Sequence, residues 1–234
     1  MRTSILLLAF VVVWGCGSGP SADTRPSEEP AAPPSDARRP ALGADPVIVA
    51  FGDSLTAGYG VPLGQSYPDY LRRGLDRLGF SYVVRNEGMS GDTTNGGLVR
   101  KEIVSALNPE YVIVAFGGND GLRGLDPERM KSNLREMINH FRQRGSQVVL
   151  AGMKLPPNYG REYLDAFEKV FPEIAEDLDV PLIPFLLEGV GGNPELMQAD
   201  GLHPTAEGNR LVARNVLQVL EPLLAAHAEA GQAR

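Results

Sequence analysis

Val47-Ile48-Val49-Ala50-Phe51-Gly52-Asp53-Ser54 is the stretch of sequence that decides the fold. Its first part is an unbroken apolar run rich in β-branched residues, which predicts a strand buried on both faces. Its second part is a polar turn, and open α/β sheets place their chemistry at such carboxyl ends of strands. Ser54 is therefore a candidate nucleophile. The alternative is that Ser54 only caps a helix, which is the commoner role of a serine before a helix.

Downstream of this stretch, short apolar runs alternate with longer amphipathic segments. The expected strands are 47–51, 81–85, 111–116, 147–153 and 181–184. The expected helices are 66–78, 93–107, 127–144, 161–177 and 205–224. Because the strands alternate with helices and no hairpin signal occurs, we expect one α/β domain with a five-stranded parallel sheet and helices on both faces.

Polar, glycine-containing segments follow four of the predicted strands. They are Gly52-Asp53-Ser54, residues 86–94, Gly117-Gly118-Asn119-Asp120 and, across a loop after the last strand, Asp200-Gly201-Leu202-His203-Pro204. The carboxyl ends of parallel strands lie at the same edge of a sheet. We therefore expect these four segments to meet in one site.

A base for the serine is needed because a hydroxyl group is a weak nucleophile. Of the three histidines, His140 falls inside a predicted helix and is expected to be structural or exposed, and His227 lies in the Ala-rich tail. His203 alone falls at the expected edge. Asp200, three residues earlier, can reach the imidazole and set its tautomer. The alternative for His203 is a residue that merely precedes a helix.

Donors for a tetrahedral oxyanion are also present. They are the backbone N–H of Ser54, the backbone N–H of Gly91 and the side-chain amide of Asn119. Gly91 has the alternative of serving only a tight turn. One histidine at this edge and no nearby cysteine make a zinc site improbable, so no metal and no cofactor are expected. Turn or capping roles are expected for Asp53, Asp92, Gly118 and Asp120, and no role is assigned to Arg100, Lys101 or Arg123.

In this order, the four segments resemble the four signature blocks of the SGNH (GDSL) hydrolases. Ser90-Gly91-Asp92-Thr93, residues 117–124 and Leu155-Pro156-Pro157-Asn158-Tyr159-Gly160 further resemble the bacterial branch of multifunctional arylesterases, acyl-thioesterases and lysophospholipases. The resemblance implies a flavodoxin-like three-layer α/β/α sandwich with sheet order 2-1-3-4-5. It also implies a catalytic triad of Ser54, Asp200 and His203, and an oxyanion hole made by Ser54, Gly91 and Asn119.

By the same resemblance, the loop containing Met153, Leu155 and Tyr159 lines an acyl-binding pocket. The expected function is a serine esterase that hydrolyses carboxylic esters or thioesters through an acyl-enzyme on Ser54. Two alternatives remain open: an O-acetyl esterase of a cell-envelope polysaccharide, and a non-catalytic binding module on the same fold.

The amino-terminal segment indicates export. Arg2 precedes an apolar run over residues 5–14 that is too short to span a bilayer as a helix, and Gly15-Cys16 follows. This pattern resembles a bacterial lipoprotein signal, in which Cys16 becomes the lipidated first residue of the mature chain. Ordinary secretion and an uncleaved anchor are the alternatives. We expect a signal peptide over 1–15, a disordered tether over 16–46, the hydrolase domain over 47–226 and a disordered tail over 227–234.

Charge narrows the choice of partners. The net charge is −7 and the pI is about 5.1, which argues against nucleic acid or an anionic membrane surface as a ligand. The expected partner is a small ester, thioester or lysophospholipid, and no protein partner is predicted. The expected location is the bacterial cell envelope, on the periplasmic side or outside, anchored through lipidated Cys16; a soluble secreted or periplasmic protein is the alternative.

Overall fold

The computed structural model describes residues 45–232. The predicted signal peptide, Cys16 and all but the last two residues of the predicted tether lie outside the described residues, so these predictions stand untested.

The described chain forms one five-stranded parallel sheet. Its strands are β1 (Val47–Gly52), β2 (Val83–Gly88), β3 (Tyr111–Ala115), β4 (Gln147–Ala151) and β5 (Leu182–Ile183). Their order across the sheet is β2-β1-β3-β4-β5, which confirms the predicted topology.

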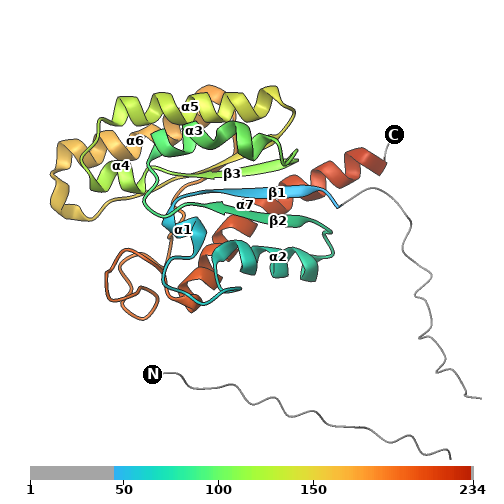
Figure 1. Cartoon of the computed structure of the whole chain (residues 1–234), viewed down its shortest axis with the longest axis horizontal. Coiled ribbons are helices and arrows are strands. Elements are labelled where there is room, and N and C mark those ends of the chain that lie inside the picture. Colours follow the sequence, from blue (N-terminus) through green and yellow to red (C-terminus); the bar gives the residue numbers. More distant parts are fainter. Residues whose placement is uncertain (1–44, 233–234) are drawn as a thin grey trace, which may run out of the picture. The chain divides into compact units, whose positions relative to one another are not determined.

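Helices cover both faces of this sheet (Figure 1). They are α1 (Ser54–Ala57), α2 (Tyr67–Leu78), α3 (Thr94–Ser105), α4 (Gly118–Leu122), α5 (Pro127–Gln143), the short 3-10 helix η1 (Pro157–Tyr159), α6 (Arg161–Leu178) and α7 (Ala206–Gln232). Helices α3, α5 and α6 pack side by side over one face, and α2 packs with α7 over the other. The three-layer α/β/α architecture is thus confirmed.

The core is centred on β1 and β3. Ile48, Val49, Ala50 and Phe51 are completely buried, because the central strand β1 is covered by helices on both faces. The Phe51 ring packs edge-on against two further buried phenylalanine rings, one from the end of β3 and one from α5. A rigid β1 therefore leads directly into the Gly52-Asp53-Ser54 turn.

The second strand starts and ends later in the sequence than expected. It was expected over 81–85, but β2 runs from Val83 to Gly88 and pairs with β1 along its whole length. Polar Arg85 and Asn86 lie within it because β2 is an edge strand, where polar side chains reach solvent. Because the apolar residues lie only at the start of β2, the apolar pattern predicts the strand too early in the sequence.

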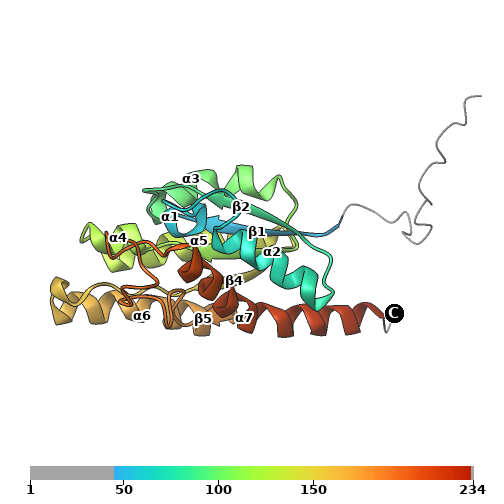
Figure 2. The same ribbon diagram turned by 90° about the horizontal axis from the view of Figure 1, so that it is seen from below.

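The carboxyl-terminal tail also differs from expectation. Residues 227–234 were predicted to be disordered, but α7 continues as a helix to Gln232. Alanine, glutamate and glutamine are good helix formers, and the His227 ring lies edge-on to Tyr111, 6.4 Å between centroids. Figure 2 shows the end of α7 at the same end of the domain as the start of β1, with α1 and α4 at the other end.

Candidate active site

Ser54 is presented by a tight turn between β1 and α1. The Asp53 side chain caps this helix, since its Oδ1 accepts a hydrogen bond from the Leu55 N–H at 3.0 Å. A Cβ added at Gly52 would lie 2.1 Å from Oγ1 of Thr56. Only glycine therefore fits at the end of β1, and Ser54 becomes the first residue of a helix that starts at the sheet edge.

His203 and Asp200 lie beside this serine. Nε2 of His203 is 2.9 Å from Oγ of Ser54, and Nδ1 of His203 is 2.7 Å from Oδ2 of Asp200. The other Asp200 oxygen accepts the backbone N–H groups of Leu202 and His203 at 2.9 and 3.0 Å. The structure thus joins into one hydrogen-bonded chain the three side chains that the sequence placed up to 149 residues apart.

The protonation of this chain follows from the environment of Asp200. Burial by itself would raise the pKa of this carboxyl group. Hydrogen bonds from the His203 ring and from the backbone N–H groups of Leu202 and His203 outweigh that effect and lower the pKa to about 2. Asp200 is consequently ionised at neutral pH and accepts the Nδ1 proton, which leaves Nε2 of His203 free to accept a proton from Ser54.

Gln198 and Tyr59 hold the loop that carries His203 against the segment that follows Ser54. The Gln198 amide donates to the backbone oxygens of Tyr59 and Pro204 at 2.7 and 2.9 Å. The Tyr59 ring also lies against the His203 imidazole, 4.6 Å between centroids. Neither residue was expected at the site from the sequence, because nothing in the local pattern marks a contact with a segment about 140 residues away.

All three expected oxyanion donors line one cavity. The Ser54 N–H belongs to the first turn of α1, where backbone donors have no partner within the helix. Gly91 has a left-handed backbone (φ 85°), and its N–H donates to no acceptor within residues 45–232. The Asn119 amide donates to the backbone oxygen of Asp92 at 2.9 Å and makes a second, longer contact of 3.4 Å with Oδ2 of Asp53. One well-formed bond thus anchors the Asn119 amide while its other hydrogen is held weakly.

Arg100 fixes the loop that carries Gly91. Its guanidinium donates to Asp92 Oδ2 at 2.8 Å and to the backbone oxygens of Glu87 and Gly52 at 3.2 and 3.3 Å. It also stacks on the Phe51 ring, 4.8 Å from the centroid. Arg100 therefore connects the ends of β1 and β2 to the loop that follows β2.

Arg123 holds the same loop from the other side, since it donates to the backbone oxygen of Gly91 at 2.8 Å. Neither arginine was assigned a role from the sequence, because a basic residue on a helix is most often solvated. The acceptors, which are mainly backbone carbonyl groups, carry no sequence signal. Only the packing of α3 and α4 against the loop reveals these contacts.

Two buried carboxyl groups support the site, as their expected turn and capping roles require. Asp120 accepts the N–H and the hydroxyl of Thr94 at 2.8 and 2.6 Å and so anchors the start of α3. Burial raises the pKa of Asp120. Asp53, which is only 2% exposed, is also affected chiefly by burial, which raises its pKa to about 7.

The cavity beside Ser54 has a volume of about 600 Å³. Its wall is largely apolar and includes Leu122, Met153, Leu155, Pro156, Phe185 and Met197. Met153 and Leu155 thus line this cavity and Tyr159 does not, and the contact of these residues with an acyl chain stays a prediction. Tyr159 lies in η1, and its hydroxyl donates to the backbone oxygen of Leu122 at 3.0 Å. Its side chain thus links η1 to α4 and is not among the residues that line the cavity.

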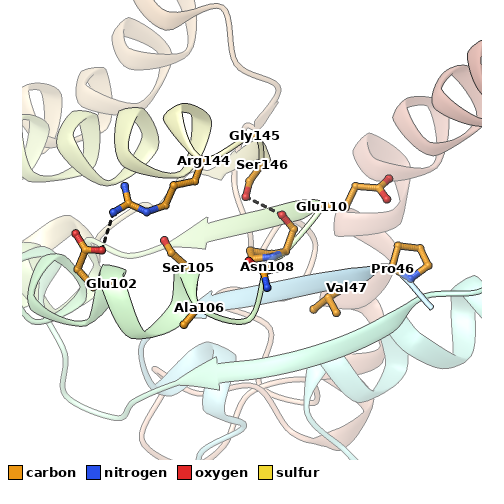
Figure 3. A pocket seen from close by; sticks show the side chains of 11 residues that line it. Pro46, Val47, Glu102, Ser105, Ala106, Asn108, Glu110, Arg144, Gly145 and Ser146 are labelled. Carbon is orange, nitrogen blue, oxygen red and sulfur yellow. Dashed lines mark hydrogen bonds and ion pairs between the residues drawn. The ribbon is translucent and has the colours of Figure 1, made fainter. Parts of the chain in front are cut away.

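A second cavity of about 650 Å³ lies at the opposite end of the sheet (Figure 3). Ser105 lines it and makes a contact of 2.7 Å with Nε2 of the buried His140. This contact resembles the serine–histidine pair of a catalytic site, but the hydrogen bond runs in the opposite direction, from the histidine to the serine. Nδ1 of His140 faces Arg144 at 3.1 Å, and a guanidinium can only donate. The proton of the neutral ring is therefore on Nε2 and is donated to Ser105.

His140 consequently cannot accept a proton from this serine. Burial, reinforced by Arg144, lowers the pKa of His140 and keeps the ring neutral. Glu102 pairs with Arg144 at 2.7 Å, as Figure 3 shows, and lies 3.6 Å from the His140 ring. The arrangement is a structural link between α3 and α5, in keeping with the role that the sequence suggested for His140.

Within residues 45–232 no group of three or more His, Cys, Asp or Glu side chains is arranged to hold a metal ion. None of the helices in that same range is long and apolar enough to cross a membrane.

Comparison with characterised proteins gives a consistent assignment. The Pseudomonas aeruginosa esterase TesA is 40% identical over 178 residues, covering 76% of this chain and 89% of TesA. The Escherichia coli thioesterase 1/protease 1/lysophospholipase L1 is 36% identical over 185 residues, covering 79% and 87% of the two chains.

Solved structures agree with these sequence matches. The crystal structure of TesA superposes with a TM-score of 0.73, covering 76% of this chain and 99% of that one. AlinE4, an esterase of the SGNH-hydrolase family, is 41% identical and gives a TM-score of 0.66, covering 82% and 97%. Residues 50–211 match the GDSL-like lipase/acylhydrolase family. The chain therefore belongs to this family, the SGNH hydrolases, whose members hydrolyse esters.

Proposed function

We propose that this protein is a serine hydrolase that cleaves carboxylic esters or thioesters through an acyl-enzyme on Ser54. The observation that carries the proposal is the continuous Asp200–His203–Ser54 chain, with contacts of 2.7 and 2.9 Å, which opens into an apolar cavity. An ionised orienting acid, a correctly oriented imidazole and a nearby hydroxyl are what acyl transfer through serine requires.

In the first half of the reaction, Oγ of Ser54 attacks the carbonyl carbon of the substrate while Nε2 of His203 takes the hydroxyl proton. The oxyanion that forms receives hydrogen bonds from the N–H groups of Ser54 and Gly91 and from the Asn119 amide. When the tetrahedral intermediate collapses, the bond from carbon to the alcohol oxygen or thiol sulfur breaks. The His203 proton then passes to that leaving group.

In the second half, water attacks the acyl-enzyme and gives a proton to His203. The bond to Oγ breaks, Ser54 recovers the proton, and a free carboxylic acid leaves. Asp200 holds the imidazolium in place in both halves without taking its proton. Met153 and Leu155 contact the acyl chain in this scheme.

The size and lining of the cavity favour an acyl chain longer than acetyl. A volume of about 600 Å³ with walls of Leu, Met, Pro and Phe side chains suits an aliphatic or aryl acyl group. The names of the relatives, which include arylesterase, thioesterase and lysophospholipase, support the same range of substrates. An O-acetyl esterase of an envelope polysaccharide remains the alternative, and it would show no gain in rate beyond two acyl carbons.

We further propose that the enzyme works in the bacterial cell envelope, anchored through lipidated Cys16. The chain enters β1 at Val47, and Ser54 follows the far end of that strand, about 20 Å away at 3.3 Å per residue. The predicted tether over residues 16–46 could reach up to about 100 Å if fully extended. The cavity is therefore free to face the anchoring membrane or soluble esters. Palmitate labelling that is lost in Cys16→Ala tests the anchor, and equal labelling of both proteins excludes it.

The decisive experiment on function is Ser54→Ala with p-nitrophenyl butyrate. We expect hydrolysis to fall to background while circular dichroism and urea unfolding remain unchanged. Ser90→Ala is the matched control, because Ser90 lines the same cavity and has no part in the triad. A fluorophosphonate probe is expected to label the wild type and Ser90→Ala only. Turnover retained by Ser54→Ala would exclude the mechanism, and a wild type that resists the probe would favour a non-catalytic module.

A further inference from the structure

Lys154 is a positive charge in the wall of the catalytic cavity. It follows Met153 directly in the loop after β4, and its side chain is exposed. It lines the same cavity as Ser54 and His203, and it is the one lysine or arginine among the described residues that does so. Lys154 and the catalytic residues therefore border the same space, into which the leaving group of the substrate is released.

The partner of this ammonium is an aromatic ring. Nζ of Lys154 lies 5.2 Å from the ring centroid of Phe185, another residue of the cavity wall. By contrast, the ammonium groups of Lys101 and Lys131 each form an ion pair with a glutamate. No carboxylate within residues 45–232 pairs with Lys154. A cation held by a ring keeps its charge available, since an aromatic face does not neutralise it.

Few other charges compete at this surface. Three other ionisable residues line the cavity: Asp53, which is buried and has a raised pKa, His203, which belongs to the catalytic chain, and Tyr59, whose ring lies against His203. The remaining wall is largely apolar, so an anion that enters the cavity finds one fixed cation to approach. Lys154 offers a point charge on a flexible stem, which suits a phosphate group.

From this arrangement we propose that Lys154 selects ester substrates that carry a phosphate on the leaving-group side of the scissile bond. Two substrate classes share this chemistry: a lysophospholipid, whose phosphate is attached through glycerol, and an acyl-coenzyme A thioester. This inference rests on the proposed function and adds to it a preference for anionic leaving groups, set by a residue that takes no part in bond breaking.

The preference has a definite kinetic form. Binding through Lys154 is the same in the ground state and the transition state, so its loss raises KM and leaves kcat unchanged. Because Lys154 is exposed, the contribution is modest and screened by salt. We expect Lys154→Met to raise KM for a phosphate-bearing ester about 2- to 5-fold at low ionic strength. We expect little change for an uncharged ester of the same chain length.

The experiment uses three substrates with the same octanoyl chain, each below the concentration at which it aggregates. They are octanoyl-lysophosphatidylglycerol, the thioester octanoyl-coenzyme A and the uncharged ester monooctanoylglycerol. Lys154→Met keeps the packing over Phe185 and removes the charge, whereas Lys154→Arg keeps the charge. Lys169→Met is the matched control, because Lys169 is exposed on α6 and lies outside the cavity wall. Each protein is assayed at low and high sodium chloride.

We expect wild type, Lys154→Arg and Lys169→Met to show a KM for the phosphate esters that rises with salt, and Lys154→Met to lose this dependence. A response with both phosphate esters assigns the contact to phosphate in general, and a response with lysophosphatidylglycerol alone assigns it to glycerophosphate. Equal changes in KM for charged and uncharged esters, or no change at all, would overturn the role of Lys154. Wild-type protein that hydrolyses none of the three esters would instead overturn the proposed function, and the role of Lys154 with it.

Discussion

Replacing Arg100 with methionine tests how the Gly91 loop is held. In the structure the Arg100 guanidinium forms a short ion pair with Asp92, at 2.8 Å, and two longer hydrogen bonds, of 3.2 and 3.3 Å, to backbone carbonyl groups at the ends of β1 and β2. A hydrogen bond to a charged group contributes about 1.5–3 kcal/mol and an ordinary one about 1 kcal/mol. The Asp92 side chain is 17% exposed, so water recovers part of the loss. We therefore expect the free energy of unfolding to fall by about 3–4 kcal/mol.

The same change should slow catalysis. Without Arg100 the loop after β2 is free to shift, and a displacement of about 1 Å in a positioning group costs up to about 100-fold in rate. We expect kcat for p-nitrophenyl butyrate to fall about 10- to 100-fold with a smaller change in KM. Arg100→Lys should recover only part of both losses, since an ammonium cannot reproduce the geometry of three guanidinium contacts.

Urea unfolding and steady-state kinetics measure the two effects separately. Arg72→Met is the matched control, because Arg72 forms an exposed ion pair with Asp76 on α2, where loss is expected to cost less than about 0.5 kcal/mol. A stability loss no larger than that of Arg72→Met would refute the energetic reasoning. An unchanged kcat in a destabilised Arg100→Met protein would refute the link between Arg100 and the oxyanion donors.

Other substitutions probe separate parts of the site. Asn119→Ala should lower kcat about 10²- to 10³-fold because it removes an oxyanion donor, and a loss below tenfold would exclude that role. Burial raises the pKa of Asp53 from its ordinary value of 3.8 to about 7, so the contribution of the protonated Asp53 to the free energy of unfolding is complete below pH 3.8 and is lost as the pH rises through 7. We therefore expect the unfolding free energy of the wild type to fall relative to Asp53→Asn by something on the order of 4 kcal/mol between about pH 4 and pH 8; parallel pH curves would contradict this. Leu155→Trp should fill part of the cavity and reduce kcat/KM for decanoyl esters about tenfold or more while sparing acetyl esters, and equal losses for both chain lengths would show that Leu155 does not contact the acyl chain.

The parallel strands and the position of the main polar residues were predictable from the sequence pattern, whereas the strand order came from the family resemblance. Buried parallel strands are continuous apolar runs, and β1 and β3 therefore stood out at once. The edge strand β2 was harder to place, because solvent accepts its polar side chains. The Ala-rich tail was expected to be disordered, although a helix that is already supported by the core extends readily through residues of high helix propensity.

Within the site, the sequence indicated Ser54, Asp200 and His203 because acyl transfer requires these side chains and the sheet topology brings their loops to one edge. It gave no indication of Arg100, Gln198 or Lys154. Arg100 and Gln198 donate to backbone carbonyl groups, which every residue has. Lys154 lies over the ring of Phe185, some thirty residues further along the chain.

The difference between what the sequence predicts and what only the structure shows has a simple physical cause. Local pattern records burial and chain direction, so it is sufficient to identify a parallel α/β sheet with a serine at the end of β1. Contacts between distant segments depend on how the helices pack, and no local pattern records them. Packing alone settles that Asp53 is buried enough for its pKa to reach about 7, that the proton of His140 points toward Ser105, and that the Tyr159 hydroxyl binds the backbone of Leu122.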